Sequence, residues 1–144
     1  QFLALGLGAN FDGKIWDVSK FIELAKFLKD IFSVIILVGD QKDAALSKEF
    51  ISEHKGTVID CCGHYNLIET AAIIKESNFF VGNDSGLGHI ASAVGTKSFT
   101  IFGIGSPQRY KPWGEKAFWT QDKNYEINNV KSRAVASKII QIIN

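Results

Sequence analysis

Short continuous runs of apolar residues alternate along the chain with segments in which apolar residues recur every three or four positions. The continuous runs predict buried strands, and the helical spacing predicts amphipathic helices. The expected strands cover about 2–7, 34–38, 57–59, 79–82, 98–102 and 118–120. The expected helices cover about 17–30, 43–54, 66–77, 85–94 and 130–142.

This alternation of solid apolar strands with helices favours an α/β fold whose parallel sheet is covered on both faces. We expect one Rossmann-like domain over residues 1–144, a doubly wound parallel sheet with strand order 3-2-1-4-5-6. Asp17 or Ser19 is placed to cap the first helix, and Asn66 with Glu69 has the spacing of a capping box. Gly95 stands where a helix usually ends.

Composition narrows the class of protein further. The chain has 144 residues and a formal net charge of +1, so nothing in its charge implies nucleic acid or an anionic membrane as a partner. No apolar run approaches the roughly 20 residues of a membrane span. Cys61 and Cys62 are adjacent, which predicts buried, reduced thiols. The sequence contains no methionine, from which we expect either a processed chain or a piece of a longer protein.

The segment NDSGLGH, residues 83–89, joins a predicted strand to a predicted helix. The first amides of a helix have no intrahelical partner, and Gly86 would let an anion approach them without a Cβ in the way. Ser85 is placed to cap the helix or to donate its hydroxyl. Asp84 is placed to cap the helix or to accept a donor from a ligand. A phosphate site and a plain capped turn are both open interpretations of these residues.

Two cationic side chains are expected near the same edge of the sheet. Lys14 follows the first strand, and strands one and four are neighbours in the expected order, so its ammonium could neutralise a diphosphate there. His89 lies one turn into the following helix, either as a phosphate partner or as a structural residue. A dinucleotide fingerprint is excluded, because Phe11 stands where its third glycine would be.

The segment SPQRYKPWG follows the fifth predicted strand. It combines Arg109 and Lys111 with aromatic residues between two prolines. This segment is either a basic and aromatic lip over the pocket or a rigid surface loop.

Taken together, GNDSGLGHIA, GTKSFTIFG and SPQRYKPWG resemble glycosyltransferase family 9, the heptosyltransferases that use ADP-heptose to build lipopolysaccharide. Lys14-x-Trp16 resembles the family's Lys-x-Trp segment, and the similarity covers essentially the whole chain. In two places the chain departs from the family's usual pattern. Asp17 stands where proline is common, and Gly88 stands where methionine is often found.

The resemblance implies that the chain is the C-terminal half of a GT-B architecture, with the N-terminal acceptor domain absent. Residues that match the family's signature would bind the diphosphate and sugar of the donor: Lys14, Asp84, Ser85, Gly86, Leu87 and His89. Asp43 would lie near the nucleoside ribose. No metal and no cofactor is implied, and the nucleotide sugar, ADP-heptose, is a substrate.

The resemblance further implies an inverting transfer of heptose or a related sugar to lipopolysaccharide core or a similar envelope glycan. The general base would lie on the missing N-terminal domain, so no catalytic residue is assigned here. The expected location is the bacterial cytoplasm, at the inner face of the cytoplasmic membrane if the full-length protein associates peripherally with it. Two alternatives are a free-standing nucleotide-sugar module without catalysis and another GT-B protein such as a sugar-nucleotide epimerase.

Overall fold

Six parallel strands form the centre of the protein, and the computed structural model describes all residues from 1 to 144. The sheet order is β3-β2-β1-β4-β5-β6, so the predicted doubly wound order is confirmed. The strands are β1 (Phe2–Gly6), β2 (Val34–Val38), β3 (Thr57–Asp60), β4 (Phe79–Asn83), β5 (Ser98–Phe102) and β6 (Ala117–Gln121).

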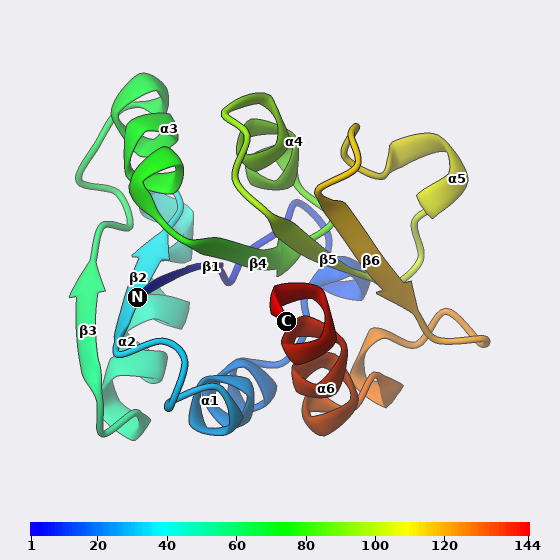
Figure 1. The fold of residues 1–144 in the computed structure, drawn as a ribbon, viewed down its shortest axis with the longest axis horizontal. Helices are drawn as coiled ribbons and strands as arrows, with labels where there is room; N and C mark the ends of the chain where they lie inside the picture. The colour runs from blue at the N-terminus through cyan, green and yellow to red at the C-terminus, as the bar shows by residue number, and fades with distance from the viewer.

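Helices cover both faces of this sheet, as Figure 1 shows. On one face lie α1 (Val18–Phe27), α2 (Ala44–Glu53) and α6 (Ser132–Ile143), and on the other lie α3 (Leu67–Glu76) and α4 (Gly86–Ala93). A short α5 (Pro107–Tyr110) and three 3-10 turns, η1 (Asp12–Lys14), η2 (Gln41–Asp43) and η3 (Ile127–Asn129), complete the chain. None of the helices is both long enough and apolar enough to traverse a bilayer.

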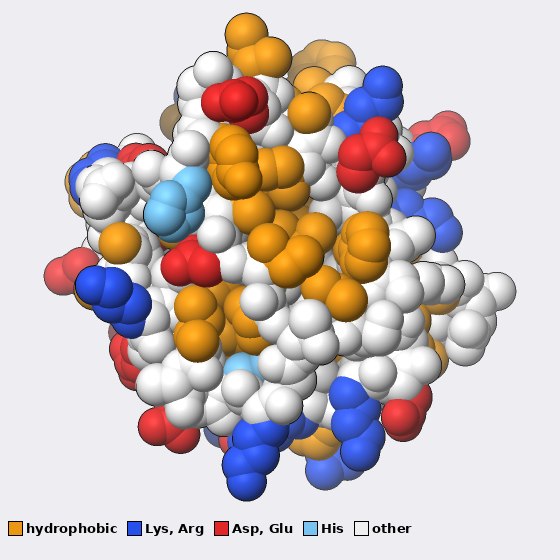
Figure 2. All heavy atoms as spheres, turned by 90° about the vertical axis from the view of Figure 1, so that its left-hand side faces the viewer, with side chains coloured by type: hydrophobic (Ala, Val, Ile, Leu, Met, Phe, Trp, Pro, Cys, Tyr) orange, Lys and Arg blue, Asp and Glu red, His pale blue; other side chains and the backbone are white.

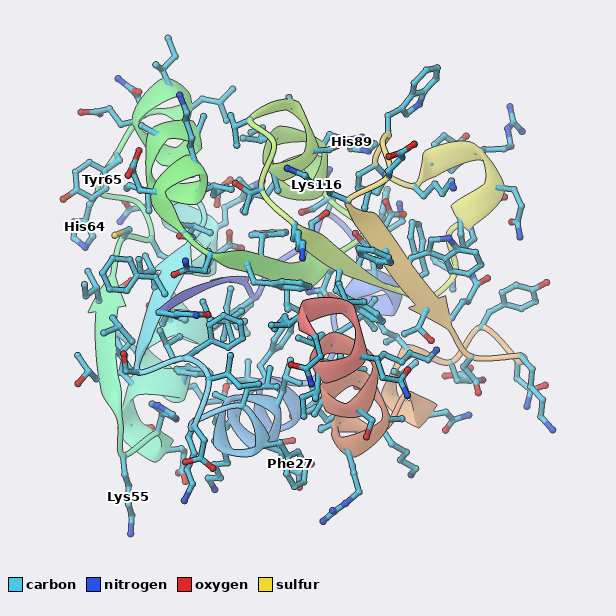
Figure 3. All side chains as sticks on the ribbon, in the orientation of Figure 1. Phe27, Lys55, His64, Tyr65, His89 and Lys116 are labelled. Atoms are coloured by element: carbon cyan, nitrogen blue, oxygen red, sulfur yellow. The ribbon has the colours of Figure 1, made fainter.

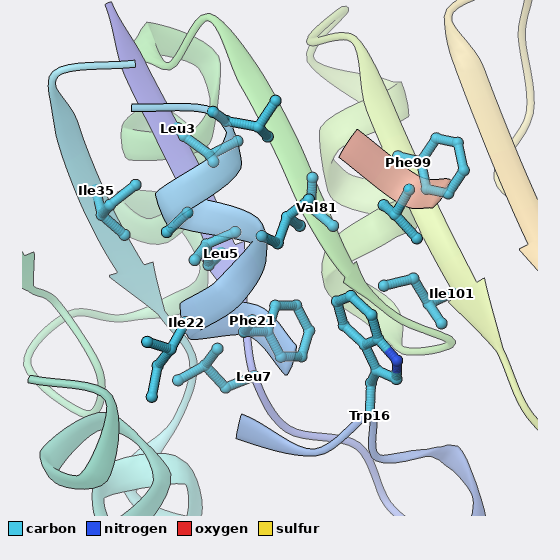
Figure 4. Close-up of a cluster of buried hydrophobic side chains, with 14 of the residues drawn as sticks. Leu3, Leu5, Leu7, Trp16, Phe21, Ile22, Ile35, Val81, Phe99 and Ile101 are labelled. Atoms are coloured by element: carbon cyan, nitrogen blue, oxygen red, sulfur yellow. The ribbon is translucent and has the colours of Figure 1, made fainter. Parts of the chain in front are cut away.

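The larger hydrophobic core lies between the sheet and the helices α1 and α6 (Figure 4). Trp16 is fully buried there and packs edge-on against Phe21, with ring centroids 4.9 Å apart. Its indole Nε1 donates to the carbonyl of Val130 at 3.1 Å. Trp16 therefore anchors the chain just after the loop that carries Lys14.

Local chemistry at the helix ends agrees with the sequence. Asp17 caps α1 by accepting the Ser19 amide at 2.8 Å, and Asn66 and Glu69 form a capping box at α3. Gly95 adopts a positive φ of 82° just beyond α4, a conformation that glycine adopts without steric cost.

Both cysteines are buried and unpaired. Burial is the main cause that raises the pKa of the Cys62 thiol to about 12. The thiolate is the reactive form of cysteine, so these side chains act as small apolar groups. Their predicted burial is confirmed.

The sheet ends at β3, which forms one edge. Figure 2 faces this side of the molecule and shows hydrophobic side chains gathered over it. Exposed members from β3 and the start of α3 are Ile59, Leu67 and Ile68. The surface on this side of the molecule therefore exposes several large hydrophobic side chains close together.

Some boundaries differ from the sequence-based expectation. Residues 107–110 form a helical turn where a loop was expected, since Pro107 stands at its first position, where a missing amide costs nothing. The last helix begins at Ser132, two residues later than predicted. Ser85 is the residue flanking α4 rather than its first helical residue.

Candidate functional site

The loops that follow β1 and β4 meet at the carboxyl edge of the sheet. These two strands are direct neighbours, with Gly6 opposite Gly82. The Lys14 Nζ atom lies 3.0 Å from Asp84 Oδ2, and Ser85 is the next residue along the chain. The predicted convergence of Lys14 with the start of α4 is therefore confirmed as geometry.

The Lys14–Asp84 ion pair is largely shielded from water. The side chains are 24% and 8% exposed, respectively. A Cβ added at Gly105 would lie 2.5 Å from Asp84 Oδ2, so the loop after β5 packs closely against the carboxylate. An ion pair in such surroundings is screened less than one on the surface.

At the start of α4, backbone and side-chain donors are free. Ser85 has the extended backbone of a capping residue, with φ −152° and ψ 171°, yet its side chain makes no capping hydrogen bond. The Gly88 amide donates to the Ser85 carbonyl at 3.3 Å, which leaves the amides of Gly86 and Leu87 at the open end. No heavy atom lies within 4 Å of a Cβ built on Gly86. This helix end is suited to an anion.

A cavity of about 720 Å³ begins at this helix end and extends toward α2 and α3. A volume of this size is in the range of small-molecule sites. It is lined by Gly8, Ala9, Asn10, Ile15, Gly39, Asp40, Lys42, Asp43, Leu46, Tyr65, Leu67, Thr70, Ser85, Gly86, Leu87 and Ile90. Ser85, Gly86, Leu87 and Asp43 of the predicted site therefore share one cavity.

Asp43 is one of two acidic residues that line this cavity, the other being Asp40. The Asp43 carboxylate packs against two glycines, because a Cβ on either Gly8 or Gly39 would overlap it. Oδ2 accepts the Asp40 amide at 3.1 Å. Burial is the main cause that raises the pKa of the Asp43 carboxyl above its usual value. No three His, Cys, Asp or Glu side chains lie close enough together in this structure to share a metal ion.

Five predicted residues lie outside the cavity lining. Two of them, Lys14 and Asp84, form the ion pair beside it. His89 is exposed, and Figure 3 shows it on the side of α4 that faces α5. Arg109 and Lys111 are also exposed, and the Arg109 guanidinium lies 5.7 Å from the centre of the Tyr110 ring. The segment 106–114 therefore does not form part of the cavity lining.

Two side chains that the sequence did not single out hold the site together. Asn83 is fully buried and makes hydrogen bonds to both ends of the Lys14 loop. Gln121 donates to the carbonyls of Gly103 and Gly105, each at 2.7 Å. The sequence does carry a signal for Asn83, because it is a polar residue at the end of an apolar strand, where burial requires hydrogen-bond partners. Nothing along the sequence points to Gln121.

Comparison with known proteins places the chain in a family. Residues 1–140 match glycosyltransferase family 9 (heptosyltransferase). The chain is 32% identical to lipooligosaccharide heptosyltransferase 2 of Haemophilus influenzae and 30% identical to lipopolysaccharide heptosyltransferase 2 of Escherichia coli. Each comparison extends over 115 residues, which are 76% of this chain and 33% of the relative.

Solved structures agree on the fold. The E. coli ADP-heptose heptosyltransferase II superposes with a TM-score of 0.92 at 23% identity, over 99% of this chain and 46% of that one. An E. coli heptosyltransferase solved with ADP gives 0.89 at 20% identity, over 98% and 44%. The chain belongs to glycosyltransferase family 9 and matches about a third of the length of these curated relatives.

Proposed function

We propose that this chain is the donor-binding half of a glycosyltransferase that transfers heptose, or a related sugar, from its ADP derivative. The observation that carries the proposal is the convergence of an ammonium and the free amides of α4 beside a cavity of about 720 Å³. Family membership supports the sugar donor, because the relatives are heptosyltransferases. Because these relatives are named as transferases, the comparison does not favour the alternative of a nucleotide-sugar binding module without catalysis.

In the proposed complex the diphosphate lies at the start of α4. The amides of Gly86 and Leu87 and the hydroxyl of Ser85 donate to its oxygens, while Lys14 neutralises part of its charge. As the bond to the sugar breaks, negative charge develops on the leaving diphosphate, and donors already in place stabilise it. No metal is needed for this step.

The nucleoside lies in the part of the cavity lined by α2 and α3. Asp43 accepts a ribose hydroxyl there, and apolar side chains such as Leu46 and Leu67 contact the base. We retain Asp84 and His89 as contacts of the donor sugar, and Arg109 and Lys111 as a lip that closes over the ligand. His89, Arg109 and Lys111 would reach the donor only after movement of the segment 106–114.

The remaining parts of the reaction belong to residues outside this chain. The acceptor, a saccharide of the lipopolysaccharide core, would bind to an N-terminal domain that also supplies the general base. The full-length protein would act in the cytoplasm and associate peripherally with the inner membrane. These assignments rest on the family and not on the geometry of this half.

Thermal unfolding in the presence of ADP, UDP or GDP tests the site. A ligand that binds only the native state raises the melting temperature, and at a hundred times its Kd the rise is roughly 5–10 °C. We expect ADP to give the largest rise and Lys14→Ala to reduce it. Lys29→Ala, an exposed lysine just after α1, is the matched control and should leave the rise unchanged. No rise with any of the three at millimolar concentration would refute the proposed site.

A further inference from the structure

The loop that carries Lys14 is tied at both ends to one side chain. Asn83 Oδ1 accepts the amide of Trp16 at 3.1 Å. Its Nδ2 donates to the carbonyl of Leu7 at 3.0 Å and to that of Gly8 at 3.4 Å. Lys14 lies between these two attachments, so neither end of the loop can move away from β4 without breaking a buried hydrogen bond.

The middle of the same loop is held by contacts from other strands. Lys14 pairs with Asp84, the residue after Asn83. A Cβ on Gly103 would overlap the carbonyl oxygen of Gly13, so the loop after β5 lies directly against the backbone next to Lys14. Gln121 fixes that second loop through the carbonyls of Gly103 and Gly105. The ammonium is therefore fixed with its loop before any ligand arrives.

We propose that Asn83 is a positioning residue for the diphosphate, acting through the Lys14 loop. A lysine ammonium ends a flexible four-carbon stem, and ordering such a side chain on binding lowers affinity. Ordering a flexible loop on binding likewise lowers affinity, and Asn83 removes that cost in advance by fixing the backbone on both sides of Lys14. This inference rests on the proposed function, because it assumes that Lys14 binds the diphosphate.

Amide hydrogen exchange tests the first half of the inference without ligand. In Asn83→Ser the amides of residues 8–16 should exchange faster than in the wild type, and the Trp16 amide most of all. Asn83→Asp has the same shape and keeps the acceptor for Trp16, so it should free mainly the Leu7 end. Asn78→Ala is the matched control: Asn78 accepts the Phe2 amide at 2.7 Å at the opposite end of the same two strands, and its loss should leave residues 8–16 protected.

Calorimetry on the 144-residue chain tests the second half. Asn83→Ser adds no charge near the phosphates and should weaken ADP binding about tenfold. The affinity for adenosine, which has no phosphate for Lys14 to bind, should stay within about twofold of the wild type. In the Lys14→Ala background, Asn83→Ser should cause little further loss of ADP affinity. Asn83 is proposed to act through the Lys14 ammonium, which that background has already removed.

Each outcome decides a separate point. An equal loss for ADP and adenosine, or additive losses in the double variant, would reduce Asn83 to a general structural residue. Unchanged exchange over 8–16 in both Asn83 variants would overturn the inference outright, as would failure of both variants to fold. Absence of ADP binding to the wild type would refute the proposed function, while the exchange data would still decide whether Asn83 holds the loop.

Discussion

The side chains at the N-terminal capping positions of α3 and α4 differ in their hydrogen bonds. One stabilises its own helix, and the other is free to bind a ligand. Asn66 uses its side chain to accept the Glu69 amide at 2.8 Å. Ser85 occupies the same position at α4 but makes no such bond. A hydroxyl that its own helix does not use is available to a ligand.

We therefore predict opposite effects for two alanine substitutions. Ser85→Ala should change the free energy of unfolding by less than about 0.5 kcal/mol and weaken ADP binding by roughly three- to tenfold, the effect of one hydrogen bond. Asn66→Ala should cost about 1 kcal/mol of stability. Urea unfolding and calorimetry measure the two quantities. A large stability loss in Ser85→Ala would show that the hydroxyl has a structural partner instead.

Asp43 carries a cost for stability that the proposed binding role would explain. Burial raises the pKa of its carboxyl, so the folded protein binds this proton more tightly than the unfolded chain does. The resulting stabilisation is present at acid pH and is lost as the pH rises through the raised pKa. At neutral pH the ionised carboxylate therefore destabilises the fold.

Asp43→Asn should consequently raise the melting temperature at pH 7. The side-chain carbonyl can still accept the Asp40 amide, which Asp43 Oδ2 accepts in the wild type. The difference between variant and wild type should shrink as the pH approaches 4, because the wild-type carboxyl then becomes protonated. ADP binding should weaken at the same time if Asp43 accepts a ribose hydroxyl. Melting curves between pH 3.5 and 7.5 test this, and a pH-independent difference would contradict it.

At the scale of elements, glycine is present at the two ends of α4 for two different physical reasons. Gly86 has open space where its Cβ would be, whereas Gly95 adopts a positive φ of 82°. An L residue at φ of this sign is strained by roughly 1 kcal/mol. One glycine therefore serves the approach of a ligand, and the other serves the end of the helix.

Alanine at each position should separate these roles. Gly86→Ala should keep or raise stability, by up to about 1 kcal/mol, and should weaken ADP binding because its methyl group lies between the phosphate and the amides. Gly95→Ala should lose roughly 1 kcal/mol and bind ADP normally. Denaturant titration and calorimetry distinguish the pair. Unimpaired ADP binding by Gly86→Ala would mean that the phosphate does not approach α4 at this point.

The elements that the sequence predicted well are those whose signal is local. The run VIILV forms β2 because β-branched residues suit a strand buried on both faces, and four of its five residues are buried. The turns η1, η2 and η3 were missed, since three-residue helices have no periodicity to detect. Helix α5 was also missed, because four residues between Ser106 and Lys111 are too short for a helical pattern.

The candidate site shows the same division. Lys14 and the start of α4 could be brought together from strand order alone, because neighbouring parallel strands deliver their loops to one edge. Asn83 could not be assigned its partners, which lie 67 to 76 residues away in sequence. The distance between Lys14 and Asp84 likewise depends on the packing of the β5 loop, which only the folded chain reveals.

At the scale of the whole molecule, all the proposed donor contacts lie at one end of a parallel sheet. The strands and the core beneath them give a rigid base, as the buried Trp16 and its bond to Val130 illustrate. The curated relatives are about three times longer than the stretch matched here. Binding and chemistry are therefore expected to be separable in this protein.

The last prediction follows from that separation. The 144-residue chain should bind ADP and ADP-heptose but should release no ADP in the presence of a lipopolysaccharide acceptor, because a bound diphosphate without a general base lacks the group that activates the attacking hydroxyl. Calorimetry measures the binding, and a coupled assay for ADP measures the transfer. The E. coli lipopolysaccharide heptosyltransferase 2, assayed with its own acceptor, controls for the substrates and the assay. Acceptor-dependent ADP release by this chain, abolished in Lys14→Ala, would place a catalytic base within residues 1–144 and overturn the division of roles proposed for the two halves.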